Sequence, residues 1–147
     1  MRKIIIYTDG GSRGNPGPAA VGAVFLNEKG QIIRKYSDYL GETSDNEAEY
    51  QAAIFALNKF KALFGRKLAS QTEIELRSDS ELLIKQMSGE YKILEPKIQS
   101  LFITLWNLKL DFKKVKFKLI SREKNKEADR LVNEILDSQA SQNSLLQ

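Results

Sequence analysis

The chain has 147 residues, a net charge of +4 at pH 7, and neither histidine nor cysteine. Its length suits one domain with a substantial core. The missing cysteine excludes disulfides and thiolate zinc sites, and the missing histidine removes the usual general base near neutral pH. Any hydrolytic chemistry must therefore use carboxylates, lysines or hydroxyls, and such oxygen ligands favour magnesium or manganese.

Three strands are expected in the N-terminal part of the chain. Residues 4–8 form a nearly continuous apolar run, as in a strand that is covered on both faces. A loop rich in glycine and proline follows, and residues 20–26 and 31–40 read as two more strands around a turn at 27–30. Successive strands with short connections predict an antiparallel meander.

The pattern then changes to the spacing of a helix. Ser44 or Asp45 can cap its start, and Gly65 follows its end. Its apolar residues recur every three or four positions, at Ala53, Leu57, Phe60 and Phe64. The rest of the chain predicts a fourth strand, a short helix, a longer helix, a fifth strand and a last helix, at residues 73–77, 80–88, from 96 onward, 115–119 and 124–137.

This order of elements predicts an α/β fold. Helices between the later strands imply parallel crossovers, and hence a mixed five-stranded sheet, an antiparallel meander plus two parallel strands, flanked by helices. We expect a single domain over residues 1–137 and a polar, flexible C-terminal tail over 138–147. No segment reaches the apolar length of a membrane span and no signal-peptide pattern is present, so we expect a cytoplasmic protein without a membrane partner. No feature of the sequence suggests an obligate oligomer, and we expect a monomer.

Positive charge is concentrated toward the C-terminal end of the chain. Residues 109–130 contain nine Lys/Arg against four Asp/Glu. A basic segment of this kind suits a polyanionic partner. The lysines at positions 114, 116 and 118 could equally form the solvent face of an edge strand, where they discourage aggregation.

Four carboxylates are candidates for a shared site. Asp9 ends the first strand and Asp79 follows the fourth, so parallel pairing would bring both to the carboxyl edge of the sheet. Glu49 lies on the sheet-facing side of the first helix, and Asp129 borders the apolar face of the last helix. Each alone could be an ordinary turn, cap or surface residue.

Together, four acids at one end of the fold would repel one another in a low dielectric. Divalent cations would neutralise them. Two ions bridged by such acids hydrolyse phosphodiesters without imidazole. The neighbouring loop GGSRGNPG has neither the spacing of a dinucleotide fingerprint nor a Walker lysine. It is either a flexible connection between strands or a backbone surface that a nucleic-acid strand can approach closely.

Four segments also match known signatures in order and spacing: YTDGGSRGNPGPAAVG, SDNEAEYQAAIFAL, RSDSELLIKQMSGEY and REKNKEADRLVNE. They resemble type 1 ribonuclease H in its compact prokaryotic form, over residues 4–135. The resemblance implies a ribonuclease H-like fold. It also implies endonucleolytic cleavage of the RNA strand of RNA–DNA hybrids by two Mg²⁺ ions, with 5′-phosphate and 3′-hydroxyl products, and Mn²⁺ as a substitute.

The resemblance also assigns residues. The metal-binding and catalytic acids would be Asp9, Glu49, Asp79 and Asp129. Glu47 is a neighbouring candidate, but the family pattern places the ligand directly before Tyr50, and the helical phase agrees. Contacts with the hybrid are implied at Gly10, Ser12, Asn15, Thr43, Ser44 and Asn46.

The chain departs from the family pattern in three places. Many relatives carry a histidine before the last aspartate, which is thought to help protonation or product release. This chain has SREKN there, so that step would use water or a neighbour such as Glu123. Asp45 stands where asparagine is common, which leaves one nucleic-acid contact open. A basic insertion between residues 87 and 96 is missing. Affinity would then depend on Lys92, the lysines after Asp111 and the loop at 122–126, and hybrid choice on groove shape and 2′-hydroxyls.

Two other functions remain open at this point. A domain of the same fold could bind nucleic acid without cutting it, although such domains usually lose one or more of the acids. The chemistry could also extend to double-stranded RNA, because neither the compact form nor the missing histidine enforces a choice of hybrids.

Overall fold

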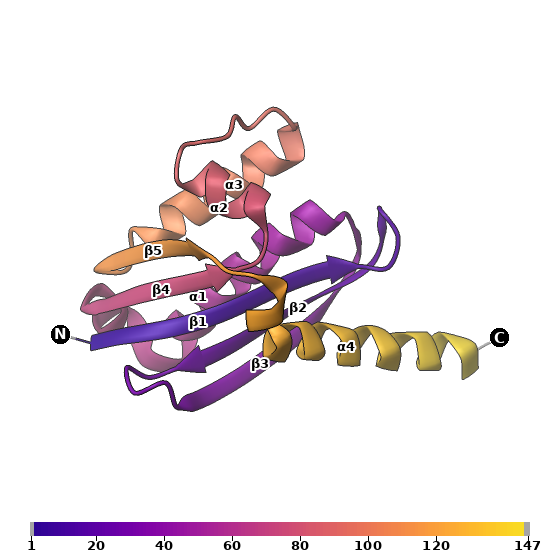
Figure 1. The fold of residues 1–147 in the computed structure, drawn as a ribbon, viewed down its shortest axis with the longest axis horizontal. Helices are drawn as coiled ribbons and strands as arrows, with labels where there is room; N and C mark the ends of the chain where they lie inside the picture. Colours follow the sequence, from indigo (N-terminus) through magenta and orange to yellow (C-terminus); the bar gives the residue numbers. More distant parts are fainter. Residues whose placement is uncertain (1, 146–147) are drawn as a thin grey trace.

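The computed structural model describes residues 2–145, which contain one five-stranded sheet. Its strands lie in the order β3-β2-β1-β4-β5 (Figure 1). β1 pairs antiparallel with β2, and β2 with β3, whereas β1–β4 and β4–β5 are parallel pairs. The predicted mixed sheet is therefore confirmed. The strands are β1 (Arg2–Ser12), β2 (Gly17–Leu26), β3 (Ile32–Thr43), β4 (Thr72–Ser78) and β5 (Lys114–Leu119).

The helices cover both faces of this sheet. One face carries α1, with α2 and α3 beside it, whereas α4 crosses the opposite face and projects beyond the sheet (Figure 1). No helix within residues 2–145 is both long and apolar enough to cross a membrane. The helical elements are α1 (Asp45–Ser70), α2 (Glu81–Met87), α3 (Pro96–Lys109), a 3-10 turn η1 (Arg122–Lys124) and α4 (Lys126–Leu145).

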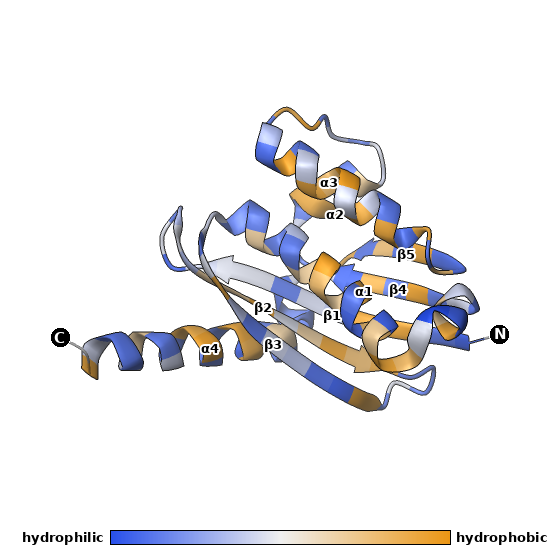
Figure 2. Cartoon of the chain, turned by 180° about the vertical axis from the view of Figure 1, so that it is seen from behind, coloured by the Kyte–Doolittle hydropathy of each residue, from blue (hydrophilic) through white to orange (hydrophobic). Residues whose placement is uncertain are grey.

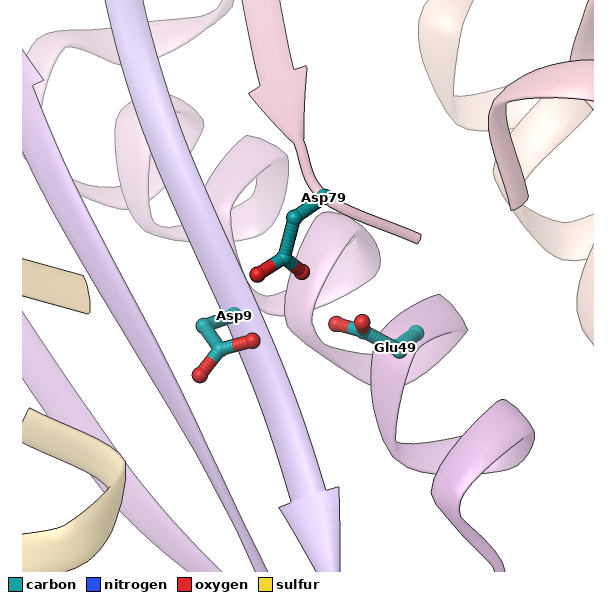
Figure 3. Close-up of side chains that lie close together, drawn as sticks. All are labelled: Asp9, Glu49 and Asp79. Atoms are coloured by element: carbon teal, nitrogen blue, oxygen red, sulfur yellow. The ribbon is translucent and has the colours of Figure 1, made fainter. Parts of the chain in front are cut away.

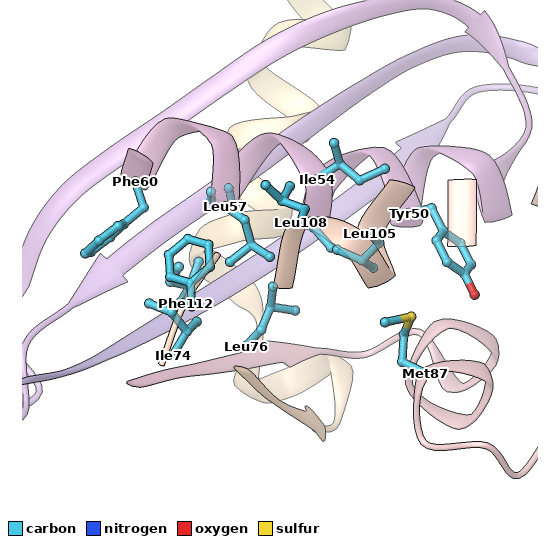
Figure 4. Packing of buried hydrophobic residues seen from close by; sticks show 14 of the residues in the cluster. Tyr50, Ile54, Leu57, Phe60, Ile74, Leu76, Met87, Leu105, Leu108 and Phe112 are labelled. Atoms are coloured by element: carbon cyan, nitrogen blue, oxygen red, sulfur yellow. The ribbon is translucent and has the colours of Figure 1, made fainter. Parts of the chain in front are cut away.

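The main core lies between α1, α3 and the sheet. Leu57 and Phe60 of α1 pack among buried residues from β4 and α3, which include Leu76 and Leu105 (Figure 4). Removing this apolar surface from water is the main stabilising term. Hydrophobic and hydrophilic residues follow one another along the helices, as Figure 2 shows by hydropathy. The core thus fixes α1 against the sheet.

A second, smaller core lies under α4. Ala128 and Leu131 pack with Val24 of β2, and Val132 and Leu136 pack with Ala20. Gly22 allows this close packing, because a Cβ there would stand 2.7 Å from the carbonyl oxygen of Ala128. The start of α4 is therefore held close to the centre of the sheet.

Several element boundaries differ from the predictions, among them those of β1, α1 and α4. β1 continues through Asp9 to Ser12 because β2 pairs with it up to Ser12 opposite Ala19, so Asp9 lies inside the strand rather than at its end. Gly65 interrupts α1 with φ 86° and ψ 163°, but helical residues follow as far as Ser70. α4 does not end near residue 137, because residues 138–145 are helical too. That this segment is flexible remains a prediction.

Candidate active site

Asp9 and Asp79 lie side by side at the carboxyl edge of the central strands. The parallel register places Tyr7 opposite Arg77, and each acid stands two residues further along its strand direction. β4 ends at Ser78, so Asp79 is the first residue of the connection to α2. Asp9 remains mostly buried, with 7% of its surface exposed. The strand pairing itself therefore brings these two carboxylates together, as the sequence predicted.

Glu49 reaches the same point from the first turns of α1. Its Oε1 accepts a hydrogen bond of 2.8 Å from the backbone amide of Gly10. α1 can approach β1 this closely because position 10 has no side chain: a Cβ there would lie 2.1 Å from the carbonyl oxygen of Ala48. One carboxylate oxygen from each of Asp9, Glu49 and Asp79 lies within 4.8 Å of the others (Figure 3). Such a group can hold a divalent cation.

Asp129 enters the site from the first turns of α4. It lines the same groove, of about 560 Å³, as the other three acids. Asn133, one turn further along the helix, donates from Nδ2 to Asp129 Oδ2 at 3.2 Å. All four predicted acids therefore share one groove, although the tight cluster consists of three.

The acids affect one another electrostatically. Burial, reinforced by the Asp79 and Asp129 carboxylates, raises the pKa of Asp9 to about 8. Burial together with Asp9 and Asp79 raises the pKa of Glu49 well above its ordinary value. Burial also raises the pKa of Asp79, and the Arg122 guanidinium opposes this increase. A divalent cation would relieve the repulsion, and a set of only oxygen donors fits Mg²⁺ or Mn²⁺.

Glu47 and Glu49 occupy different environments, as the helical phase predicted. The Glu47 carboxylate accepts a hydrogen bond from the Thr43 hydroxyl. The Glu47 backbone amide donates to Ser44 Oγ at 3.2 Å. These contacts make Thr43 and Ser44 part of the helix start, with Ser44 as the N-cap. Glu47 therefore stabilises the first turn of α1 and takes no part in the carboxylate cluster.

Three of the other predicted substrate residues are part of the groove. Gly10, Ser12 and Asn46 line it directly. Asp45 also lines it, and its Oδ1 accepts from the Ser12 amide at 2.9 Å and hydroxyl at 2.8 Å. Asn15 Oδ1 accepts from the Asp45 amide at 3.2 Å. The glycine-rich loop is thus fastened to the start of α1, and its contact with nucleic acid remains a prediction.

The sequence pointed to the loop at 122–126 as a whole, and the structure separates its residues. Arg122 lines the groove with the acids. Glu123, expected as a neighbour able to replace the missing histidine, instead lines a separate cavity of about 230 Å³ with Tyr7 and Val24. Asn125 is buried and donates from Nδ2 to the Thr8 carbonyl oxygen at 2.8 Å. These residues have different surroundings because successive side chains of the loop point in different directions. No periodicity in the sequence predicts those directions.

A mixed sheet that gathers acids from two parallel strands and two helices into one groove defines the class: an α/β domain with a carboxylate cluster that can hold divalent cations. The profile of a family described as "Reverse transcriptase-like" matches residues 7–135. The LC11-RNase H1 structure, solved with an RNA/DNA hybrid, is 47% identical over 93% of this chain and 99% of that one, with a TM-score of 0.88. The chain belongs to the type 1 ribonuclease H family.

Two curated relatives are similar to this chain over most of its length. Ribonuclease HI of Halobacterium salinarum is 38% identical over 92% of this chain and 65% of the relative. A bifunctional protein of Mycobacterium tuberculosis is 34% identical over 94% of this chain but only 36% of that protein. The chain thus spans about a third of the length of the mycobacterial relative and about two thirds of the halophile one.

Proposed function

We propose that the chain is an endoribonuclease that hydrolyses the RNA strand of RNA–DNA hybrids and leaves 5′-phosphate and 3′-hydroxyl ends. The observation that carries the proposal is the convergence of Asp9, Glu49 and Asp79 within 4.8 Å, in a groove that Asp129 also lines. The hybrid complex of the LC11 neighbour supports the choice of substrate.

The proposed chemistry uses two divalent cations, Mg²⁺ by preference and Mn²⁺ as a substitute. Asp9, Glu49 and Asp79 would hold one ion, and Asp9 with Asp129 would contribute to the second. Bound ions lower the pKa of water and neutralise the charge that develops on the scissile phosphate. Without histidine, no imidazole of this chain can act as the general base.

The groove supplies the other requirements of the reaction from its own residues. The Gly10 amide holds one oxygen of Glu49, so that the carboxylate keeps its orientation toward the cluster. Arg122 places a positive charge beside the acids, where an RNA phosphate would bind. Gly10, Ser12 and Asn46 at the groove, with Asn15, Thr43 and Ser44 beside them, would contact the two strands. A cytoplasmic, monomeric enzyme is part of the same proposal.

A cleavage assay on three labelled duplexes tests this function. Hybrid, duplex RNA and duplex DNA are each incubated with the protein and Mg²⁺ or Mn²⁺, and the ends of the products are identified. We expect cleavage of the RNA strand of the hybrid. Hybrid binding without product would indicate a binding domain, and equal cleavage of duplex RNA would widen the substrate class.

Variants of the acids test the metal site in the same assay. Asp9→Asn and Asp79→Asn should lose nearly all cleavage, by about 10³-fold or more, because each removes a charge from the proposed cation position. Hybrid binding should survive. Glu47→Gln is the matched control, because Glu47 is on the same helix as Glu49 but outside the cluster. Normal cleavage by Asp9→Asn would contradict the proposal.

A further inference from the structure

Asn125 joins the start of α4 to the central strand of the sheet through a buried hydrogen bond. Its surface is 1% exposed. Its Nδ2 donates to the carbonyl oxygen of Thr8 at 2.8 Å, across 117 positions of sequence. Thr8 is buried too and immediately precedes Asp9. The bond therefore holds the stretch of backbone that carries the first acid of the site.

The backbone of Asn125 begins the helix that carries Asp129. The Asp129 amide donates to the Asn125 carbonyl oxygen at 3.1 Å, and the Asn125 amide donates to the Arg122 carbonyl oxygen at 3.0 Å. One residue thus connects η1, the first turn of α4 and β1. Through these bonds it links the backbone of Asp9 to the backbone of Asp129.

The other contacts of α4 with the sheet constrain its position less. Ala128 and Leu131 pack against Val24, and such apolar contacts are not directional. The ion pair between Lys35 and Glu127, at 2.9 Å, joins two exposed side chains and contributes little to stability. Metal ligands, in contrast, must be placed to within a few tenths of an ångström. A directional, buried hydrogen bond can meet that requirement.

We propose that Asn125 is a positioning residue that sets the separation between Asp9 and Asp129 needed for the second cation. The inference rests on the proposed metal-dependent function. The Nδ2 of Asn125 satisfies the buried Thr8 carbonyl, but its Oδ1 is buried without a hydrogen-bond partner within the described part of the chain, so the two effects on stability oppose each other. A buried acceptor in that state destabilises the fold.

Two substitutions of Asn125 test the inference, with a matched control on the same helix. Asn125→Ala removes the side chain, and Asn125→Asp keeps its shape but presents an acceptor to the Thr8 carbonyl. Leu131→Ala removes buried packing of α4 and leaves the link intact. Mn²⁺ binding is measured by calorimetry without nucleic acid, and hybrid cleavage is measured over a range of Mg²⁺ concentrations.

Of the two Mn²⁺ ions, we expect the more weakly bound one to bind about tenfold less tightly to both Asn125 variants than to the wild type. Both variants should also need about tenfold more Mg²⁺ for half-maximal cleavage. Their kcat should fall while KM for the hybrid stays within about twofold. The added charge of Asn125→Asp would by itself attract cations, so weaker binding there reports lost geometry. Leu131→Ala should lower the melting temperature and leave both metal measurements unchanged.

A double-mutant cycle shows whether Asn125 acts through Asp129. In an Asp129→Asn background, Asn125→Ala should cause no further loss of Mn²⁺ affinity. The inference is overturned if folded Asn125→Ala binds Mn²⁺ as the wild type does, or if its effect is unchanged in that background. If Asn125→Ala does not fold, the Mn²⁺ affinity of Asn125→Asp decides the question by the same criteria. If wild type fails to cut hybrids but the Mn²⁺ results are as expected, the proposed function fails and the positioning role stands.

Discussion

The backbone amide of Gly10 donates a hydrogen bond of 2.8 Å to Glu49 Oε1, which joins the central strand to the first helix inside the carboxylate cluster. The contact depends on the absence of a side chain at position 10, where a Cβ would meet the Ala48 carbonyl oxygen at 2.1 Å. Gly10 therefore allows α1 to approach β1 closely, in addition to any flexibility that it gives the loop. It sets the distance between Asp9 and Glu49.

Gly10→Ala should consequently separate α1 from β1 and disturb the cluster. We expect at least a 100-fold loss of hybrid cleavage and a destabilisation of about 2 kcal/mol or more, as for other overpacked sites. Gly11→Ala is the matched control, because a Cβ there would only touch Val132 at an ordinary 3.7 Å. Cleavage kinetics and urea unfolding of both variants check the prediction. Equal behaviour of the two would contradict it.

The raised pKa of Asp9 predicts how stability depends on pH when no cation is bound. A carboxyl whose pKa rises from 3.8 to about 8 on folding holds its proton more tightly in the folded state. Its stabilising contribution is thus present below about pH 4 and is lost as the pH rises toward 8. In EDTA we expect the melting temperature to fall by about 3 °C or more between pH 5 and pH 8.

Two comparisons make this pH prediction specific. Asp9→Asn should flatten the decline, whereas Asp38→Asn, at an exposed position on β3, should leave it unchanged. Millimolar Mg²⁺ should restore stability at pH 8, because the cation replaces the protons as the balancing charge. Calorimetric melting curves provide the test. A wild-type melting temperature that rises over this range in EDTA would be incompatible with the prediction.

The sequence predicted the sheet and its four acids because both depend on short-range patterns. The alternation of residues gives the strands, and the phase of the helix separates Glu49 from Glu47. Loop orientation has no such periodicity. The charged side chains of η1 differ in direction from one residue to the next, so the placement of Arg122 in the groove and of Glu123 outside it required the structure.

The length of α4 was underestimated for a related reason. The apolar periodicity of the helix ends at Leu136, and the residues beyond it are polar, which favoured an end near residue 137. Helix propensity and the preceding turns carry the helix on to Leu145 without further burial. A pattern of buried residues predicts where a helix packs, and not how far it continues into solvent.

Deletion of residues 138–147 should therefore leave the domain folded. The last buried residue of α4 is Leu136, and the deletion retains Asp137, which forms an ion pair with Arg13 at 2.6 Å. We expect the melting temperature to change by less than about 4 °C and hybrid cleavage to stay within about twofold. Further deletion back to residue 134, which removes Leu136, is the contrasting variant and should destabilise strongly. Loss of folding in the shorter deletion would contradict a domain that ends near residue 137.

Arg122 is expected to contribute to hybrid binding, because it places a positive charge in the groove beside Asp79. Lys124 is two residues away but lines two other cavities and not the groove. Lys124→Gln therefore removes one positive charge outside the groove and serves as the control. Arg122→Gln should raise Kd for the hybrid by about fivefold and reduce the slope of log K against log salt by about 1, as for the loss of one phosphate contact. Lys124→Gln should change neither quantity. Titrations of labelled hybrid from low to high salt, in Ca²⁺ to prevent turnover, measure both variants, and identical slopes for Arg122→Gln and wild type would exclude a phosphate contact at this position.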